Sequence, residues 1–475
     1  MNQAPLRALS AALLARLPFA DAASESLPLS RLLRLGLFQV SVAMALTLMA
    51  GTLNRVMIVE LGVSAALVAV MFSIPLLLAP ARALIGLRSD THHSAFGWRR
   101  VPYLWNGTLL QFSGLAIMPF ALLLLQGSHT GGLWQGRVGA ALAFFLAGSG
   151  AHVVQTAGLA LATDLATERT RPRVVALLYV MLLIGTLLSA LAFGAALQRF
   201  GPTRLVQVVQ GAALLTVVLN VAALWGQEPR NRARAAQPPP RVPFRRAWRE
   251  FTADRRATRL LVAVGLGTAG FSMQDILLEP YGAQVLHLGV AQTSLLTALM
   301  ASGALLALWF AARQLARGAD AMRLAALGAV VGAFGFAAVT LASPLGSAGI
   351  FRAGIVAIGF GSGLFGVATL SATMSLAVGD RAGLVLGAWG AVQATTAGTA
   401  VALGGMLRDA LGALAARGVL GAAVQSPTFG YTFVYHLEIA ALFAALVALG
   451  PLARPAGAVP RRTSTEPFGL AELPG

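Results

Sequence analysis

Apolar stretches recur along almost the whole chain, and this pattern limits the possible folds more than any other feature. An α-helix rises 1.5 Å per residue, so about 20 apolar residues are enough to cross the hydrocarbon core of a bilayer. Charged residues make up 11% of the 475 residues, whereas a soluble domain carries about 25%. The sequence therefore predicts an all-α polytopic membrane protein.

Hydropathy predicts twelve transmembrane helices, and glycine or proline inside several of them is compatible with helix in a membrane. Their expected ranges are 35–58, 66–87, 101–125, 138–163, 174–197, 205–225, 260–278, 293–315, 322–341, 350–376, 384–407 and 433–452.

A long polar break divides the chain into two sets of six predicted helices. It carries nine arginines and three consecutive prolines, and part of it, residues 244–251, is either a helix lying on the inner leaflet or a solvated linker. The expected organisation is an N-terminal segment (1–31), an N-terminal half (32–225), a linker (226–257), a C-terminal half (258–452) and a tail (453–475).

The basic residues predict the orientation in the membrane. All 35 are arginines, and 28 of them fall on the inside if both termini are cytoplasmic, against 7 in the opposite topology. The positive-inside rule therefore places both termini in the cytoplasm of an inner-membrane protein. The net charge of +18 resides mainly in the loops between helices, which argues against nucleic acid as a partner. The chain has no cysteine and no disulfide.

Short matches between the halves indicate an internal duplication. Residues 61–63 recur as 288–290, and Gly-Ser-Gly at 148–150 recurs as 361–363. The loop after the second helix resembles the one after the eighth, which carries Arg317, Gly318, Asp320 and Arg323. This six-plus-six organisation resembles the major facilitator superfamily of transporters.

The loop after the second helix also resembles the cytoplasmic signature of that superfamily. We expect its acid to pair with arginines on neighbouring helix ends, which would hold the cytoplasmic side together. The signature residues are Gly86, Arg88, Asp90, Gly97, Arg99 and Arg100.

Two acids in the seventh predicted helix need an explanation. Asp275 and Glu279 are four residues apart, which predicts that they project from one side of a helix. Acids near hydrocarbon are costly unless they face protein, a cavity or a cation. Arg55, helped by Asn54, lies at a similar depth in the first helix, so we expect an ion pair with one of the acids. The alternative is that each side chain extends separately to the interface.

The expected polar cluster on the periplasmic side consists of Asn54, Arg55, Gln274, Asp275, Glu279 and Tyr281.

Three side chains are candidates for binding a pigment. His152, with Gln155 on the same face, lies near the membrane midplane, and His436 lies near the outer end of the twelfth helix. The repeat match aligns His152 and Gln155 with Phe365 and Ala368, so this polarity belongs to the first half. A neutral imidazole can bind the magnesium of a chlorin or relay protons. The alternative is a packing histidine with an ordinary hydrogen bond.

The chain resembles the PucC family of light-harvesting complex assembly proteins, a branch of the major facilitator superfamily. Four stretches carry the resemblance: residues 52–57, residues 88–90 with 97–103, residues 274–282 and residues 387–393. It implies a non-enzymatic assembly factor that holds or delivers bacteriochlorophyll to light-harvesting α and β polypeptides. The N-terminal extension, together with Arg31 and Arg34, favours the core antenna over the peripheral one. Pigment-biosynthesis or membrane-insertion machinery is a further expected partner.

A proton- or cation-coupled secondary transporter is the alternative function, with Asp275 and Glu279 as the coupling groups. The residues alone favour this transporter, and the resemblance favours the assembly factor. Gly361, Gly363 and Gly366 would let antenna helices approach closely or would pack helices inside the bundle. No metal-ligand spacing, nucleotide loop or nucleophile elbow is present, so an enzyme is not expected.

Overall fold

The computed structural model describes residues 22–24, 27–78, 98, 100–126, 132–167, 170–228, 254–375, 382–421, 424–426 and 428–453. The predicted linker helix at 244–251, most of the N-terminal segment and the C-terminal tail lie outside these residues. So do five members of the loop signature: Gly86, Arg88, Asp90, Gly97 and Arg99.

The described secondary structure is helical. The N-terminal half contains α2 (Leu29–Leu35), α3 (Leu37–Thr47), η2 (Leu48–Leu53), η3 (Val56–Glu60), α4 (Ala65–Leu77), α6 (Val101–Gln126), α7 (Gly132–Leu165), α8 (Arg171–Ala196) and α9 (Pro202–Leu224). The C-terminal half contains α11 (Arg255–Ser272), η6 (Met273–Ile276), α12 (Leu278–Val285), α13 (Val290–Ala316), α14 (Ala321–Ala342), α15 (Ala348–Ser375), α16 (Ala382–Ala416), α17 (Phe429–Leu449) and η9 (Gly450–Leu452).

Ten described helices are long and apolar enough to cross a membrane, or eleven if the bent pair α11–α12 is one span. Helix α4 has 13 residues, and residues 79–97 after it are not described, so the number twelve stays a prediction. Large apolar side chains on the outer surface are widely exposed, among them Trp134 (72%), Phe334 (71%) and Val447 (74%). Such exposure fits contact with lipid rather than water, which confirms the multi-pass membrane class.

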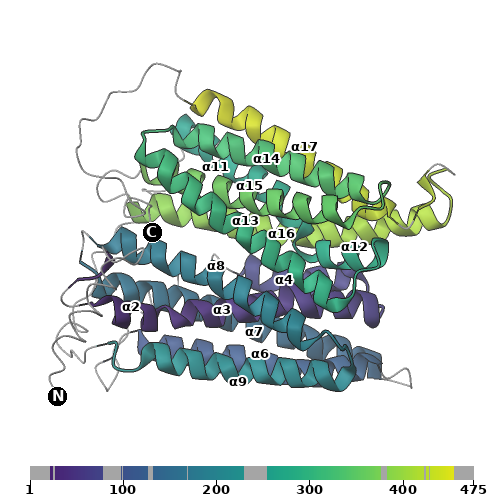
Figure 1. Cartoon of the computed structure of the whole chain (residues 1–475), viewed down its shortest axis with the longest axis horizontal. Helices are drawn as coiled ribbons and strands as arrows, with labels where there is room; N and C mark the ends of the chain where they lie inside the picture. The colour runs from purple at the N-terminus through teal and green to yellow at the C-terminus, as the bar shows by residue number, and fades with distance from the viewer. Residues whose placement is uncertain are drawn as a thin grey trace.

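The helices run roughly parallel in two groups that follow the sequence, with the N-terminal half below and the C-terminal half above in Figure 1. Helix α4 packs along α16, and α8 along α13, so these two pairs join the halves. We call the end of the bundle where α2 begins and α17 ends the terminal end. The opposite end, where η3 meets α4 and α12 meets α13, is the distal end.

Equivalent glycine contacts confirm that the halves are copies, and they also correct the register of the match. A Cβ on Gly150 of α7 would strike the backbone of α6 at Gln111, and one on Gly361 of α15 would strike α14 at Gly332. Gly150 therefore corresponds to Gly361, two residues away from the Gly-Ser-Gly alignment.

In this corrected register His152 and Gln155 correspond to Gly363 and Gly366, so the expected equivalence with Phe365 and Ala368 was wrong. Gly361 and Gly363 pack against α14 and α13. These two glycines serve the internal packing of the bundle.

Two arginines tie the first helix to the end of α9. Arg31 donates to the carbonyl oxygen of Gln227 (2.6 Å) and to its side-chain oxygen (2.9 Å), and Arg34 donates to the carbonyl of Trp225 (2.9 Å). Both carbonyls lie just after the end of α9 at Leu224, so these contacts hold the first helix to the segment that leaves α9. Both arginines thus have a structural role, which weakens their use as evidence for one particular client.

Candidate functional site at the distal boundary

The seventh predicted helix is broken where its acids lie. Helix α11 ends at Ser272, a 3-10 turn spans Met273–Ile276, and α12 leaves at an angle of 45°. The carboxylate of Glu438 in α17 accepts a hydrogen bond from the backbone N–H of Gln274 (2.8 Å), and Glu438 is fully buried. Its Oε1 therefore satisfies a main-chain donor at the break, where regular helical bonding is interrupted.

The break separates the two acids that were expected on one face, so that expectation was wrong. Glu279 is 5% exposed, whereas Asp275 is exposed and accepts from the Gln274 amide (2.7 Å). Sequence spacing alone assumes a continuous α-helix, and a 3-10 turn has three residues per turn instead of 3.6.

The first helix meets this break across the boundary between the halves. Asn54 donates to the carbonyl of Ala50 (3.0 Å) and to that of Ile276 (2.6 Å). Glu279 accepts from the hydroxyl of Thr297 in α13 (2.7 Å) and lies directly against Gly51. The predicted cluster thus brings Asn54 and Glu279 to one place, between the first helix of each half.

The predicted ion pair has a different partner. Nη1 of Arg55 lies 2.6 Å from Oε1 of Glu60, and among the described residues neither Asp275 nor Glu279 forms an ion pair with this arginine. Glu60 lies five residues on, and the segment Val56–Glu60 is a π-helix. A π-helix places residues i and i+5 above one another, which explains a pairing that α-helical spacing does not predict.

We define the distal polar cluster as Asn54, Arg55, Glu60, Gln274, Asp275, Glu279 and Glu438. Several of its buried polar atoms have no hydrogen-bond partner among the described residues, and such atoms are where water or ions are usually held. They are Asn54 Oδ1, Arg55 Nε, Gln274 Oε1, Glu279 Oε2 and Glu438 Oε2. In the described part of the chain, no group of three or more His, Asp or Glu side chains is placed to hold a metal ion.

The remaining predicted member, Tyr281, belongs to an aromatic core beside the cluster. Its ring centroid lies 5.4 Å from Phe351, 5.5 Å from Tyr431 and 5.4 Å from Tyr435, and its hydroxyl donates to Val339 (3.3 Å). Ring pairs at these separations add to the stability that burial provides. Tyr281 therefore anchors α12 by packing.

A second group of charged residues, which the sequence analysis missed, also joins the halves at the distal end. Asp409 of α16 accepts from the backbone N–H of Ala66 (2.7 Å) in the first turn of α4, and it pairs with Arg408 (2.7 Å). Arg408 also donates to Gln284 (2.7 Å) and lies over the ring of Tyr431 (4.5 Å). An acid at a helix N-terminus is favourable, and here it belongs to the other half.

At the terminal end, the described member of the loop signature has an acidic partner. Arg100 Nε lies 3.0 Å from Asp164 Oδ2 at the end of α7, and the backbone N–H groups of Arg100 and Val101 donate to Glu228. The expected pairing concerned the acid of the signature, Asp90, which lies outside the described residues, so that pairing stays a prediction.

The three pigment candidates are not brought together. His152 and Gln155 are half-buried on α7, and each has a polar interaction of its own. His436 is exposed on α17, with Nδ1 2.7 Å from the carbonyl of Thr432. A carbonyl only accepts, so Nδ1 carries the proton and the neutral ring presents Nε2 as an acceptor. That tautomer suits a metal ligand, but His436 faces outward by itself.

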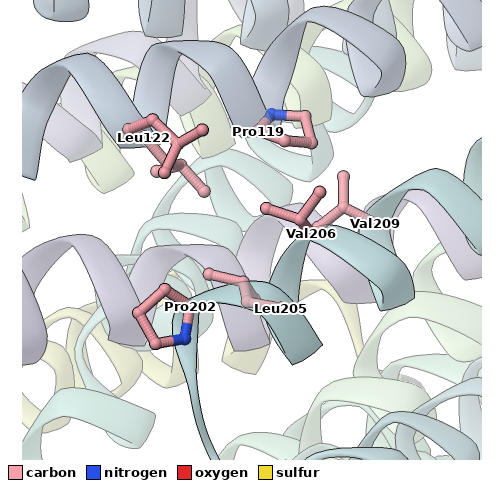
Figure 2. Close-up of a pocket in the computed structure, with 7 residues that line it drawn as sticks. Pro119, Leu122, Pro202, Leu205, Val206 and Val209 are labelled. Carbon is pink, nitrogen blue, oxygen red and sulfur yellow. The ribbon is translucent and has the colours of Figure 1, made fainter.

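A small hollow between α6 and α9 is formed where prolines interrupt regular packing. Pro119 lies inside α6, and Pro202 begins α9. Leu122, Leu205, Val206 and Val209 also line the hollow (Figure 2). Its volume is about 10 Å³, which is space for a single water molecule and for no larger ligand.

Comparisons with known proteins complete the description. The family model described as PUCC protein matches residues 52–457. An uncharacterized protein of the puhA-bchM intergenic region of Rhodobacter capsulatus is 55% identical over 96% of this chain and 97% of its own length. Protein PucC of Rhodovulum sulfidophilum is 56% identical over 83% and 88%, and Protein PucC of Rhodobacter capsulatus is 53% identical over 93% and 96%.

Solved transporters share the fold. A bacterial homologue of the iron transporter ferroportin, in an inward-facing state, has a TM-score of 0.66 at 15% identity and covers 90% of this chain and 99% of its own. The nucleoside transporter NupG has a TM-score of 0.61 at 13% identity, covering 88% and 98%. The expected major facilitator-like fold class is confirmed.

Proposed function

The chain belongs to the PUCC family, and from this membership we propose that it is an assembly factor for bacterial light-harvesting antenna complexes. The observation that carries the proposal is the family match over residues 52–457, with 50–56% identity to three PucC proteins. Family members are membrane proteins with a transporter-like fold and are not enzymes. The protein would act by binding, and its clients would be the single-span α and β polypeptides of the antenna.

The proposed client is the core complex, light-harvesting complex 1, rather than the peripheral complex 2. The support for this choice is that the relative from the puhA-bchM intergenic region matches 96% of this chain, against 83–94% for the three PucC proteins. The proposed location is the photosynthetic inner or intracytoplasmic membrane, with both termini cytoplasmic. Pigment-biosynthesis or membrane-insertion machinery would supply the client or its pigment.

Bacteriochlorophyll would be the small molecule that the protein holds or transfers. His436 fits a magnesium ligand by its tautomer, and His152 with Gln155 fits by its half-buried position on α7. When bound, the pigment would supply its absorbance to the antenna. The protein's part is to exclude water and to keep the apolar ring from aggregating.

The test uses a tagged chain isolated from pigmented membranes. We expect the core antenna polypeptides and bacteriochlorin absorbance to co-purify with it, and we expect deletion of its gene to reduce the core antenna absorbance. Co-purification with peripheral polypeptides alone would overturn the choice of client. Normal amounts of both antennas in the deletion strain would overturn the assembly function.

Secondary transport is the second candidate function, because buried carboxylates lie at the boundary between the halves of a transporter-like fold. Transport predicts a solute gradient in sealed vesicles that collapses with the proton gradient. Assembly alone predicts loss of antenna with no change in any solute flux.

A further inference from the structure

A cavity of about 210 Å³ lies between the two halves, between α8 on one side and α13, α15 and α16 on the other. It lies in the half of the bundle nearer the terminal end, because its lining residues on α8 and α16 belong to the first half of each helix. Its wall includes Tyr179, Leu308, Gly366, Leu370, Trp389 and Gln393. Trp389 and Gln393 are one turn apart and belong to the stretch 387–393, for which the distal polar cluster offers no role.

The cavity exists because α15 carries glycine where the equivalent helix of the other half carries polar side chains. A Cβ added at Gly366 would meet no atom within 4 Å, so this position borders open space. Its counterpart on α7 is Gln155, and the counterpart of its neighbour Gly363 is His152. The second half therefore has open space at this level of the bundle.

The wall is mostly apolar, with few polar groups. The indole N–H of Trp389 already donates to Thr369 (3.4 Å), and Ser362 donates to the carbonyl of Gly359 (3.2 Å). The amide of Gln393 has no hydrogen-bond partner among the described residues. A cavity with apolar walls and one available amide suits a large apolar molecule that carries a carbonyl group.

We propose that this cavity holds the macrocycle of a chlorin through its apolar faces and a hydrogen bond from Gln393, without a histidine on the metal. The inference rests on the proposed function and names a place for the pigment that is separate from His152 and His436, neither of which lines the cavity. No histidine lines the cavity, so binding here does not depend on magnesium. The aromatic side chains on its wall come from both halves, Tyr179 from the first and Trp389 from the second, so the ligand lies on their boundary.

The test compares two glycine-to-leucine variants. Gly366→Leu fills the cavity, and Gly211→Leu makes the same change on the exposed face of α9, where an added side chain also meets open space. Purified proteins in detergent are titrated with bacteriochlorophyll and with magnesium-free bacteriopheophytin, and retained pigment is read by absorbance after gel filtration. We expect wild type and Gly211→Leu to bind both pigments equally, and Gly366→Leu to bind both at least tenfold more weakly.

Several outcomes would overturn the proposal: equal pigment binding by both variants, binding of the magnesium pigment alone, or extraction of acyl lipid with no chlorin from wild-type protein. If Gly366→Leu does not give a monodisperse protein, Gln393→Leu replaces it with the same expectation. The deletion strain separates the two hypotheses. Normal antenna there refutes the assembly function, whereas loss of antenna with unaffected pigment binding by Gly366→Leu refutes the cavity alone.

Discussion

At Gly51, on the boundary between the halves, the structure leaves no space for any side chain. A Cβ at this position would lie 2.5 Å from Oε1 of Glu279 and 3.3 Å from Oγ1 of Thr297. The first helix therefore has no space for a side chain where it passes the buried acid. Glycine here allows the backbone of one half to contact a carboxylate of the other.

We expect Gly51→Ala to lower the free energy of unfolding by about 1–3 kcal/mol, the usual cost of overpacking. Adding Glu279→Ala should recover part of this loss, because the clashing atom is removed. Thermal unfolding of the four proteins in detergent gives the coupling between the two positions. If the two substitutions changed the stability additively, positions 51 and 279 would not be in contact. Gly211→Ala is the matched control, because an added side chain there meets open space.

The partner of Arg55 gives a second prediction. Arg55→Glu leaves two acids facing each other and should reduce folded protein strongly, because breaking a buried pair costs about 3–5 kcal/mol. Because Glu60 is 36% exposed, solvent screens the pair, and we expect the loss of stability to fall at the lower end of this range. Adding Glu60→Arg should restore the yield, and adding Glu279→Arg should not. The yield of monodisperse protein measures the rescue. If Glu279→Arg restored the yield and Glu60→Arg did not, Arg55 would pair with Glu279, as expected from the sequence.

These residues also mark what the sequence could predict. Hydropathy placed most helix ends to within about six residues, because the bilayer selects apolar side chains over a fixed length. The exceptions are α4, which ends at Leu77 where 87 was expected, and α16, which continues to Ala416 where 407 was expected. The sequence also brought Asn54 and Glu279 together, since buried polar groups need partners. It did not predict the Arg55–Glu60 pair, because the π-helical pitch that aligns them arises from packing and is not visible in local spacing.

Among the helical elements, the break in the seventh span depends on a residue far away in sequence. Glu438 of α17 bonds to the N–H of Gln274, 164 residues earlier. Helix α16 also comes close, since a Cβ at Gly404 would lie 2.8 Å from the carbonyl oxygen of Met273. Pro280 has no N–H to donate to the carbonyl of Ile276 four residues earlier, so the local sequence itself favours an interruption here. The tertiary contacts then fix the turn at Met273–Ile276. The short Gly-Ser-Gly match failed because it contains too few residues to fix the register.

Removing the side chain that supports the break should destabilise it. Glu438→Ala leaves a buried backbone N–H without a partner, which costs about 1–3 kcal/mol. Glu438→Gln keeps a carbonyl oxygen at the same place and should retain most of the stability. Thermal unfolding in detergent distinguishes the two variants. Equal losses would mean that the charge of Glu438, and not its bond to Gln274, supports the turn.

For the whole molecule, the closed distal end is the feature that distinguishes the candidate functions. Helix α8 approaches α13 there, and a Cβ on Gly194 would lie 3.2 Å from the carbonyl oxygen of Ala291. The halves are joined at the same end by Asp409 and the N-terminus of α4. Alternating access requires these contacts to open and close, whereas an assembly factor can keep them closed.

A disulfide across this contact tests the difference. The chain has no cysteine, so Gly194→Cys with Ser294→Cys introduces a single pair. A Cβ on Gly194 would lie 3.5 Å from the Cβ of Ser294, a separation that suits a bridge. We expect oxidation to cross-link the halves and to leave antenna assembly unchanged in cells. Gly211→Cys with Ser294→Cys should not form the bridge, because a side chain at Gly211 meets no atom within 4 Å. Loss of antenna on cross-linking, recovered by a reductant, would favour a cycle in which the distal end opens.

The two π-helical segments of the first helix have a consequence for how this span tolerates changes in length. A π turn contains about one residue more than an α turn. Deleting one residue inside Leu48–Leu53 would let that turn tighten to α pitch. The side chains before and after it would keep their orientation about the helix axis. The same deletion within α3 would rotate everything beyond it by about 100° and turn Asn54 away from Ile276. Single-residue deletions in this span are therefore best accommodated in its π-helical turns.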